Sequence, residues 1–145
     1  MEIATIGFAK KSARQFFESL KSAGIRRLVD IRLRNTSHLA GFTKKDDLAY
    51  FLRGLCDIEY VHEPLLAPTD EILDAYDTPG GTWEQYEQRF MALLAERRVE
   101  ERLNRALFDV PAVLLCSEPK PDHCHRRLVV EYLGRAWGDV TARHL

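Results

Sequence analysis

Short apolar runs alternate with segments of helical periodicity along this chain, and that alternation limits its fold more than any other feature. Four runs are expected as strands, over residues 3–8, 25–31, 58–62 and 112–116. Between them, apolar residues recur three and four positions apart, as they do on one face of an amphipathic helix. Strands that alternate with helices favour a parallel sheet that is covered by helices on both faces.

The expected helices have recognisable starts. Three pairs of residues have the spacing of a capping box, in which two side chains bond each other's backbone N–H: Ser12 with Gln15, Thr43 with Asp46, and Thr82 with Gln85. Asp122 is a good N-cap for the last helix. Residues 140–145 are an edge strand or a tail. At 145 residues we predict a single α/β domain over residues 1–145, a three-layer, Rossmann-like fold with a mainly parallel sheet.

The composition of the chain limits the kinds of molecule that it is expected to bind. The net charge is -1, so bulk charge attracts neither nucleic acid nor a membrane surface. No stretch approaches the roughly 20 apolar residues of a membrane helix, and we expect no membrane partner. The N-terminus lacks the pattern of a signal peptide. Three cysteines without such a signal indicate free thiols in a reducing cytoplasm, which is the expected location.

Reactive side chains gather after the fourth predicted strand. If the last helix begins at Asp122, Cys124 lies in its first turn, where free N–H groups and the helix dipole favour a thiolate. We predict Cys124 as a nucleophile, His125 as its acid–base partner and Glu118 as a base or a partner of arginine. Arg126 would bind an anion. The alternative is that Cys124 is a buried, inert thiol.

The same segment raises the question of a metal. Cys116, His123, Cys124 and His125 are all potential zinc ligands. Their spacing is poor for zinc, because structural sites usually pair ligands two to four residues apart in two separate knuckles. We therefore expect no metal and no cofactor. A thiol redox sensor built on Cys116 and Cys124 stays open as an alternative, because sequence does not give the distance between them.

A second cluster follows the second predicted strand. Asp30 and Arg32 should point to the same side, so that the carboxylate holds the guanidinium in place. Arg34 and Ser37 follow in a donor-rich loop, and Gly7 ends the first strand, where it allows a ligand to approach or only a tight turn. In a parallel sheet these strand ends meet at one edge, where open α/β sheets bind their ligands. The alternative is a surface ion pair beside a solvated loop.

Three groups of residues together carry a family resemblance: Thr5-Ile6-Gly7, Asp30-Ile31-Arg32, and Leu115-Cys116-Ser117-Glu118 with Cys124-His125-Arg126-Arg127. Further matching positions are Thr36-Ser37, Gly41-Phe42, Tyr60-Val61-His62 and the helix with Trp83 and Tyr86. The pattern resembles the domain-of-unknown-function 488 family of small prokaryotic proteins, with the Cys-His-Arg segment as its most specific element. Many members have a His where this chain has Phe8. The resemblance implies a cytoplasmic α/β domain with one site and no established activity.

From these residues we expect a pocket for a small anionic ligand at the strand ends. A nucleotide or a nucleic-acid end would fit, held by Arg32, Arg34 and Arg126, with Asp30 or Glu118 orienting the arginines. Cys124 would carry any reaction. The alternatives are a non-catalytic module that binds nucleic-acid backbone, and the thiol redox sensor. Whether the protein is an enzyme stays open at this point, and no oligomeric state is predicted.

Overall fold

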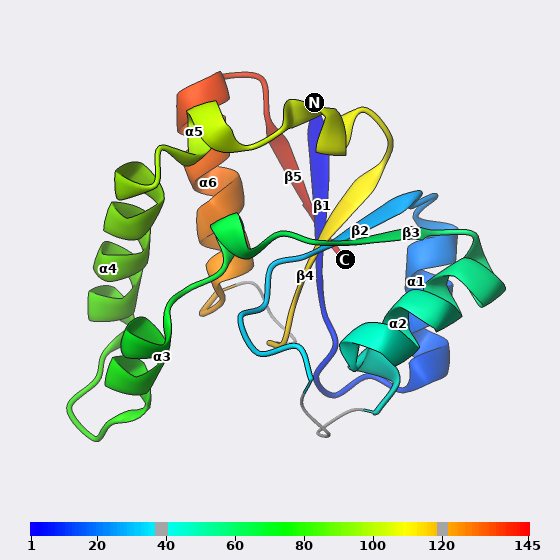
Figure 1. The fold of residues 1–145 in the computed structure, drawn as a ribbon, viewed down its shortest axis with the longest axis horizontal. Helices are drawn as coiled ribbons and strands as arrows, with labels where there is room; N and C mark the ends of the chain where they lie inside the picture. The colour runs from blue at the N-terminus through cyan, green and yellow to red at the C-terminus, as the bar shows by residue number, and fades with distance from the viewer. Residues whose placement is uncertain (37–40, 119–121) are drawn as a thin grey trace.

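One parallel sheet organises the protein. The computed structural model describes residues 1–36, 41–118 and 122–145. Its strands lie in the order β3-β2-β4-β1-β5, every neighbouring pair is parallel, and β5 is an edge strand (Figure 1). The strands are β1 (Glu2–Gly7), β2 (Arg27–Asp30), β3 (Glu59–His62), β4 (Ala112–Cys116) and β5 (Thr141–His144). The predicted α/β class with a parallel sheet is confirmed.

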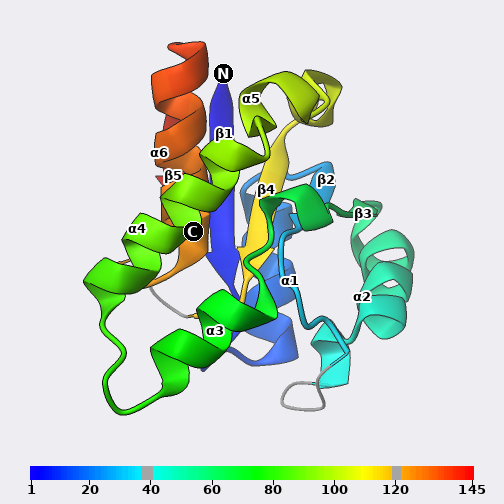
Figure 2. The ribbon, with the colours of Figure 1, turned by 60° about the vertical axis from the view of Figure 1, so that its left-hand side comes forward.

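Helices cover both faces of this sheet (Figures 1 and 2). On one face lie α1 (Ala13–Ser22) and α2 (Lys45–Phe51), which runs on as a π-helix over Leu52–Cys56. On the other face lie α3 (Asp70–Asp77), α4 (Trp83–Glu96), α5 (Val99–Arg102) and α6 (His125–Trp137). Short 3-10 turns occupy Gly41–Thr43, Pro64–Leu66 and Arg105–Phe108. Among the described residues, no helix is both long and apolar enough to cross a membrane.

The strands bury alternate residues in two cores. Ile3 and Leu114 pack with the α4 and α6 side, whereas Ile6 and Leu115 pack with the α1 and α2 side. All five residues of β4 are buried, because the strand lies in the middle of the sheet between two layers of helices. This explains why β4 is a continuous apolar run in the sequence rather than an alternating one.

The helix starts follow local capping chemistry in part. Ser12 and Gln15 form the predicted capping box, and the Thr82 hydroxyl accepts a bond from the Gln85 N–H at 3.2 Å. The box predicted at Thr43 and Asp46 is wrong: α2 follows Lys44, which caps nothing with its side chain. Thr43 is instead buried in the preceding 3-10 turn, so that its position is decided by packing and not by capping.

The start of α6 also differs from the prediction. The helix begins at His125, and Cys124, with an extended backbone, occupies the N-cap position in place of Asp122. Cys124 therefore lies immediately before the first turn, and its side chain forms no capping bond. The free N–H groups and the positive end of the helix dipole still lie next to Cys124.

The connections create a crevice at one edge of the sheet. After β1 the chain passes to α1 on one face, and after its neighbour β4 it passes to α6 on the other (Figure 1). Neighbouring strands whose connections leave toward opposite faces open a ligand crevice at their carboxyl ends. Gly7 is paired with Cys116 and Asp30 with Leu115, so the three strand ends meet there as predicted.

Candidate functional site

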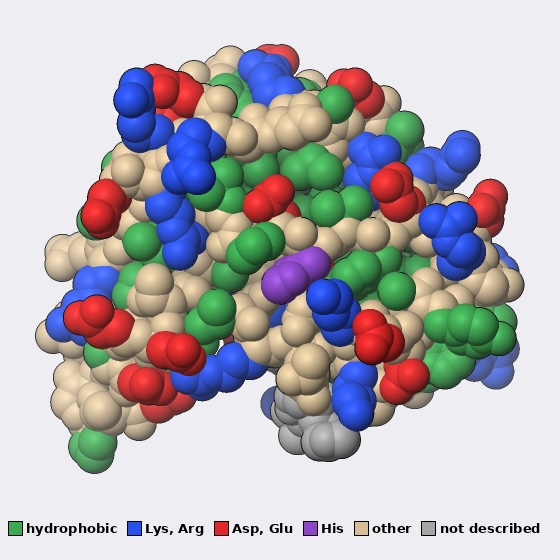
Figure 3. Space-filling view, viewed as in Figure 1, with side chains coloured by type: hydrophobic (Ala, Val, Ile, Leu, Met, Phe, Trp, Pro, Cys, Tyr) green, Lys and Arg blue, Asp and Glu red, His purple; other side chains and the backbone are tan. Residues whose placement is uncertain are grey.

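A pocket of about 580 Å³ lies at this edge of the sheet. The space-filling view shows the surface hollowed beside the acidic side chains over α3 (Figure 3). Five of the residues predicted as functional line it: Arg32, Arg34, Glu118, Cys124 and His125. The structure thus brings residues from the ends of β2 and β4 and from the start of α6 into one pocket.

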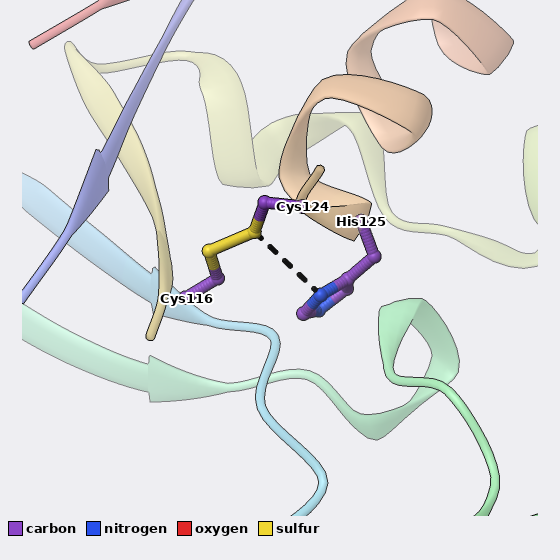
Figure 4. A group of neighbouring side chains, drawn as sticks. All are labelled: Cys116, Cys124 and His125. Atoms are coloured by element: carbon purple, nitrogen blue, oxygen red, sulfur yellow. Dashed lines mark hydrogen bonds between the residues drawn. A yellow bond between two sulfur atoms is a disulfide. The ribbon is translucent and has the colours of Figure 1, made fainter. Parts of the chain in front are cut away.

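Cys116 and Cys124 are joined by a disulfide (Figure 4). Cys116 is the last residue of β4 and fully buried, whereas Cys124 is 4% exposed and lines the pocket. The expectation of three free thiols is therefore wrong for this pair, because Cys124 at the N-cap of α6 lies beside Cys116 at the end of β4. Cys56 is a free cysteine, half-buried on the α2 side of the sheet.

His125 lies against the sulfur of Cys124. Its Nδ1 is 3.9 Å from the Cys124 Sγ (Figure 4). Its Nε2 is 2.8 Å from the backbone oxygen of Ile31. Since a carbonyl oxygen only accepts, Nε2 carries the proton, and the lone pair of Nδ1 faces the sulfur. Burial lowers the pKa of His125 to about 4, although the Ile31 oxygen acts in the opposite direction. The ring is therefore a neutral acceptor near pH 7.

Arg126 does not line the pocket. Its guanidinium is fully buried, Nη1 donates to the backbone oxygen of Glu118 at 2.9 Å, and the same atom lies 3.8 Å from the Cys116 Sγ. Burial lowers the pKa of Arg126 to about 10, and the charge of Glu118 raises it in part. Arg126 holds the segment after β4 in place beneath the pocket.

Gly7 makes room for this arrangement. A Cβ at Gly7 would lie 1.5 Å from the Glu118 oxygen and 2.4 Å from Arg126 Nη1. The close approach that a glycine allows at the end of β1 thus serves the protein's own loop and guanidinium. Gly7 supports the site from below and does not line it.

Asp30 and Arg32 form the expected pair. Arg32 Nε donates to one carboxylate oxygen at 2.9 Å and Nη2 to the other at 3.0 Å, and Nη2 also donates to the Thr43 oxygen at 2.7 Å. Tyr60 donates its hydroxyl proton to Asp30, and burial together with this bond raises the Tyr60 pKa. Asp30 is fully buried and Arg32 is 5% exposed. Two of the three guanidinium nitrogens are therefore committed within the protein.

The remaining predicted residues differ in their placement. Arg34 is exposed at the pocket and bonds Asp70 at 2.6 Å and Asp74 at 3.1 Å, both on α3. Ser37 lies outside the described residues. The pocket also contains the exposed carboxylates of Asp77 and Glu118. The positive charge of the arginines in the pocket is thus matched by the negative charge of its carboxylates.

Aromatic side chains of α4 form part of the pocket lining, which the sequence did not predict. Tyr86 and Phe90 of α4 are buried in the core. Trp83 and Tyr86 also line the pocket. Trp83 lies between His123 and Tyr86, with ring centroids 5.0 Å apart and planes 17° apart on each side. This stack connects α4 to the residue before Cys124, and the aromatic spacing on α4 was the only signal for it.

The sequence of this chain matches one known family of proteins. The model of the domain of unknown function DUF488 matches residues 12–133. The chain belongs to the DUF488 family. The matched range contains Asp30, Arg32 and the segment from Cys116 to Arg126, which carry the resemblance in the sequence. No curated protein and no solved structure matches the chain.

Proposed function

We propose that this DUF488 protein works through a thiol–disulfide pair, in which Cys124 is the reactive sulfur and Cys116 its partner. The observation that carries the proposal is the disulfide at the inner end of the pocket, with only the Cys124 side of it lining the pocket. In the reducing cytoplasm expected for this chain, the pair would be present mainly as the dithiol and would be oxidised by its substrate.

The reaction that fits is exchange with a disulfide substrate. The Cys124 thiolate attacks one sulfur of R–S–S–R in the pocket, the substrate bond breaks, and one R–S⁻ leaves and takes up a proton. The Cys116 thiolate then attacks the Cys124 sulfur of the mixed disulfide and releases the second R–S⁻, which is also protonated. Two protein thiols are oxidised to the disulfide, and one substrate disulfide is reduced to two thiols.

Three features of the structure favour the thiolate form of Cys124 and Cys116 in the reduced protein. The lone pair of His125 Nδ1 faces the Cys124 sulfur and can accept its proton. Cys124 occupies the N-cap of α6, where the helix dipole favours negative charge. Arg126 Nη1 lies 3.8 Å from the Cys116 sulfur, so a positive charge faces the thiolate that attacks in the second step.

The test uses the unequal exposure of the two sulfurs. In reduced Cys116→Ser protein, a small aromatic disulfide should form a stable mixed disulfide on Cys124, seen as added mass on the peptide that contains it. In Cys124→Ser protein the fully buried Cys116 should remain unmodified on the same time scale. Cys56→Ser is the matched control and should form the internal disulfide as wild type does. Equal modification of Cys116 and Cys124, or none of Cys124, would refute the assignment.

A small anionic ligand is a second candidate for the pocket, favoured by the presence of Arg32 and Arg34 beside Cys124. A nucleotide would place its phosphate near Arg34, in competition with Asp70 and Asp74. Titration calorimetry with inorganic phosphate and with a nucleoside monophosphate tests this, and Arg34→Ala should weaken binding. A module that binds nucleic-acid backbone would instead show affinity that falls steeply with salt.

A further inference from the structure

Three metal-binding side chains meet at the inner end of the pocket. The ligand atoms of Cys116, Cys124 and His125 all lie within 4.8 Å of one another, and all three residues are buried (Figure 4). We propose that, in the reduced protein, these three residues bind one zinc-class divalent cation and leave its fourth position open to the pocket. The inference rests on the proposed function in one respect, because it requires that the disulfide can be reduced.

One ligand distance already has the value of a tetrahedral site, and the two sulfurs must move apart when the disulfide is reduced. With Zn–S near 2.3 Å and Zn–N near 2.0–2.1 Å, neighbouring ligand atoms are about 3.6 Å apart for sulfur and nitrogen and about 3.8 Å apart for two sulfurs. The Cys124 Sγ and His125 Nδ1 are already 3.9 Å apart. The Cα atoms of Cys116 and Cys124 are 7.3 Å apart, which leaves room for their sulfurs to separate after reduction.

The surroundings of His125 suit a ligand. Its Nε2 donates to the Ile31 oxygen at 2.8 Å, so that Nδ1 is the nitrogen left to bind a cation. Metal-bound histidines usually donate their other ring N–H to a carboxylate or a backbone oxygen in this way. Arg126 Nη1, 3.8 Å from the Cys116 sulfur, would donate to the metal-bound thiolate. The ring and one of the two sulfurs thus already have the second partners typical of such sites.

The open position follows from which residues line the pocket. Cys124 and His125 line it, and Cys116 lies behind them at the end of β4. Two sulfurs and one imidazole with a fourth, open position form one of the ligand sets of catalytic zinc sites. The sequence argument against zinc rested on the spacing of the potential ligands, of which residues 124 and 125 are adjacent. Here the extended backbone of Cys124 and the helical start at His125 direct the two side chains to neighbouring points.

Oxidation and metal binding exclude each other in this site. A dithiol reductant converts the protein disulfide to two thiols and is itself oxidised to a disulfide. The cation then replaces the two thiol protons, which are released to solvent. Oxidation of the two thiolates by a substrate disulfide would form the internal disulfide and expel the cation. The bound ion would therefore mark the reduced state of the pair.

The experiment is a Co²⁺ titration of protein reduced with a phosphine, under anaerobic conditions. Wild type should bind one Co²⁺ with thiolate-to-cobalt absorption in the near ultraviolet, and Zn²⁺ should displace it. Cys116→Ser, Cys124→Ser and His125→Ala should each weaken binding roughly tenfold or more. Cys56→Ser is the matched control and should bind as wild type does, and the disulfide form should not bind.

A second measurement uses wild type alone and does not depend on the folding of variants. Zn²⁺ should slow alkylation of Cys124 in the reduced protein and leave the rate at Cys56 unchanged. Absence of the cobalt absorption, its loss in Cys56→Ser, or equal binding by the disulfide form would overturn the metal proposal. Trapping of the mixed disulfide on Cys124 in the presence of a chelator tests the redox proposal separately, so that either proposal can fail alone.

Discussion

Substituting Gly7 by alanine should disturb the site from beneath, because Gly7 packs against the backbone of Glu118, which lines the pocket, and against the buried Arg126. The added Cβ would lie 1.5 Å from the Glu118 backbone oxygen and 2.4 Å from Arg126 Nη1. A Cβ essentially never approaches a heavy atom closer than 3.0 Å. The Glu118 backbone must therefore move by about 1.5 Å, half of the normal contact distance. Because the obstacle is backbone, no side-chain rotation relieves the contact.

The expected loss of stability has two parts. Overpacking of this kind costs about 1–3 kcal/mol. The movement also lengthens the 2.9 Å bond from Arg126 to the Glu118 oxygen, and a bond to a charged group contributes about 1.5–3 kcal/mol. We therefore expect Gly7→Ala to lower the free energy of unfolding by about 3 kcal/mol or more. That is a large part of the roughly 5–15 kcal/mol that stabilises a typical domain.

Urea unfolding followed by tryptophan fluorescence measures this loss. Gly54→Ala is the matched control, because nothing lies within 4 Å of a Cβ at Gly54, and it should change the free energy of unfolding by about 1 kcal/mol or less. At the site, Gly7→Ala should also change the rate at which a dithiol reduces the disulfide. If Gly7→Ala is as stable as Gly54→Ala, the packing of Arg126 beneath the pocket is wrong.

Two further predictions concern buried ionisable groups. Asp30→Asn leaves the guanidinium of Arg32 buried without its counter-charge and should lower the free energy of unfolding by about 3–5 kcal/mol. Tyr60→Phe removes one bond to Asp30 and should lower it by about 1 kcal/mol. Urea unfolding at pH 7 measures both losses, and equal losses would contradict the role of the ion pair. In the metal-free disulfide form, burial lowers the pKa of His125 from 6.5 to about 4. As the pH falls from 6.5 toward 4, the unfolded chain gains a proton that the folded protein does not. The free energy of unfolding should fall across that window by at most about 3 kcal/mol, and a His125→Gln variant with an unchanged pH profile would refute this.

Much of the fold could be predicted because it depends on patterns that are local in sequence. The apolar run of β4 and the capping box at Ser12 each depend on a few neighbouring residues, and both are present. The meeting of Gly7, Asp30 and Cys116 at one edge follows from parallel strands and right-handed crossovers. General rules of chain geometry were therefore enough to predict that these strand ends meet at one edge of the sheet.

The details of the site depend on contacts between distant residues, which no local pattern contains. Asp122 is the better N-cap by propensity, but His123 stacks on Trp83 of α4, and the helix starts only at His125. Arg126 was expected to face a ligand. It is buried instead, because Gly7, more than a hundred residues earlier in the chain, leaves space for its guanidinium. The proximity of Cys116 and Cys124 likewise depends on where the start of α6 packs relative to the end of β4.

The most direct test of the central claim is the redox equilibrium of the cysteine pair. Wild type and Cys56→Ser protein are equilibrated in buffers of graded dithiol to disulfide ratio, the free thiols are alkylated, and each cysteine is quantified by mass spectrometry. The account predicts that Cys116 and Cys124 lose and gain label together in one two-electron transition, while Cys56 in wild type is labelled independently of them. The account would be contradicted if Cys116 and Cys124 were alkylated independently of each other and no internal disulfide formed at any ratio.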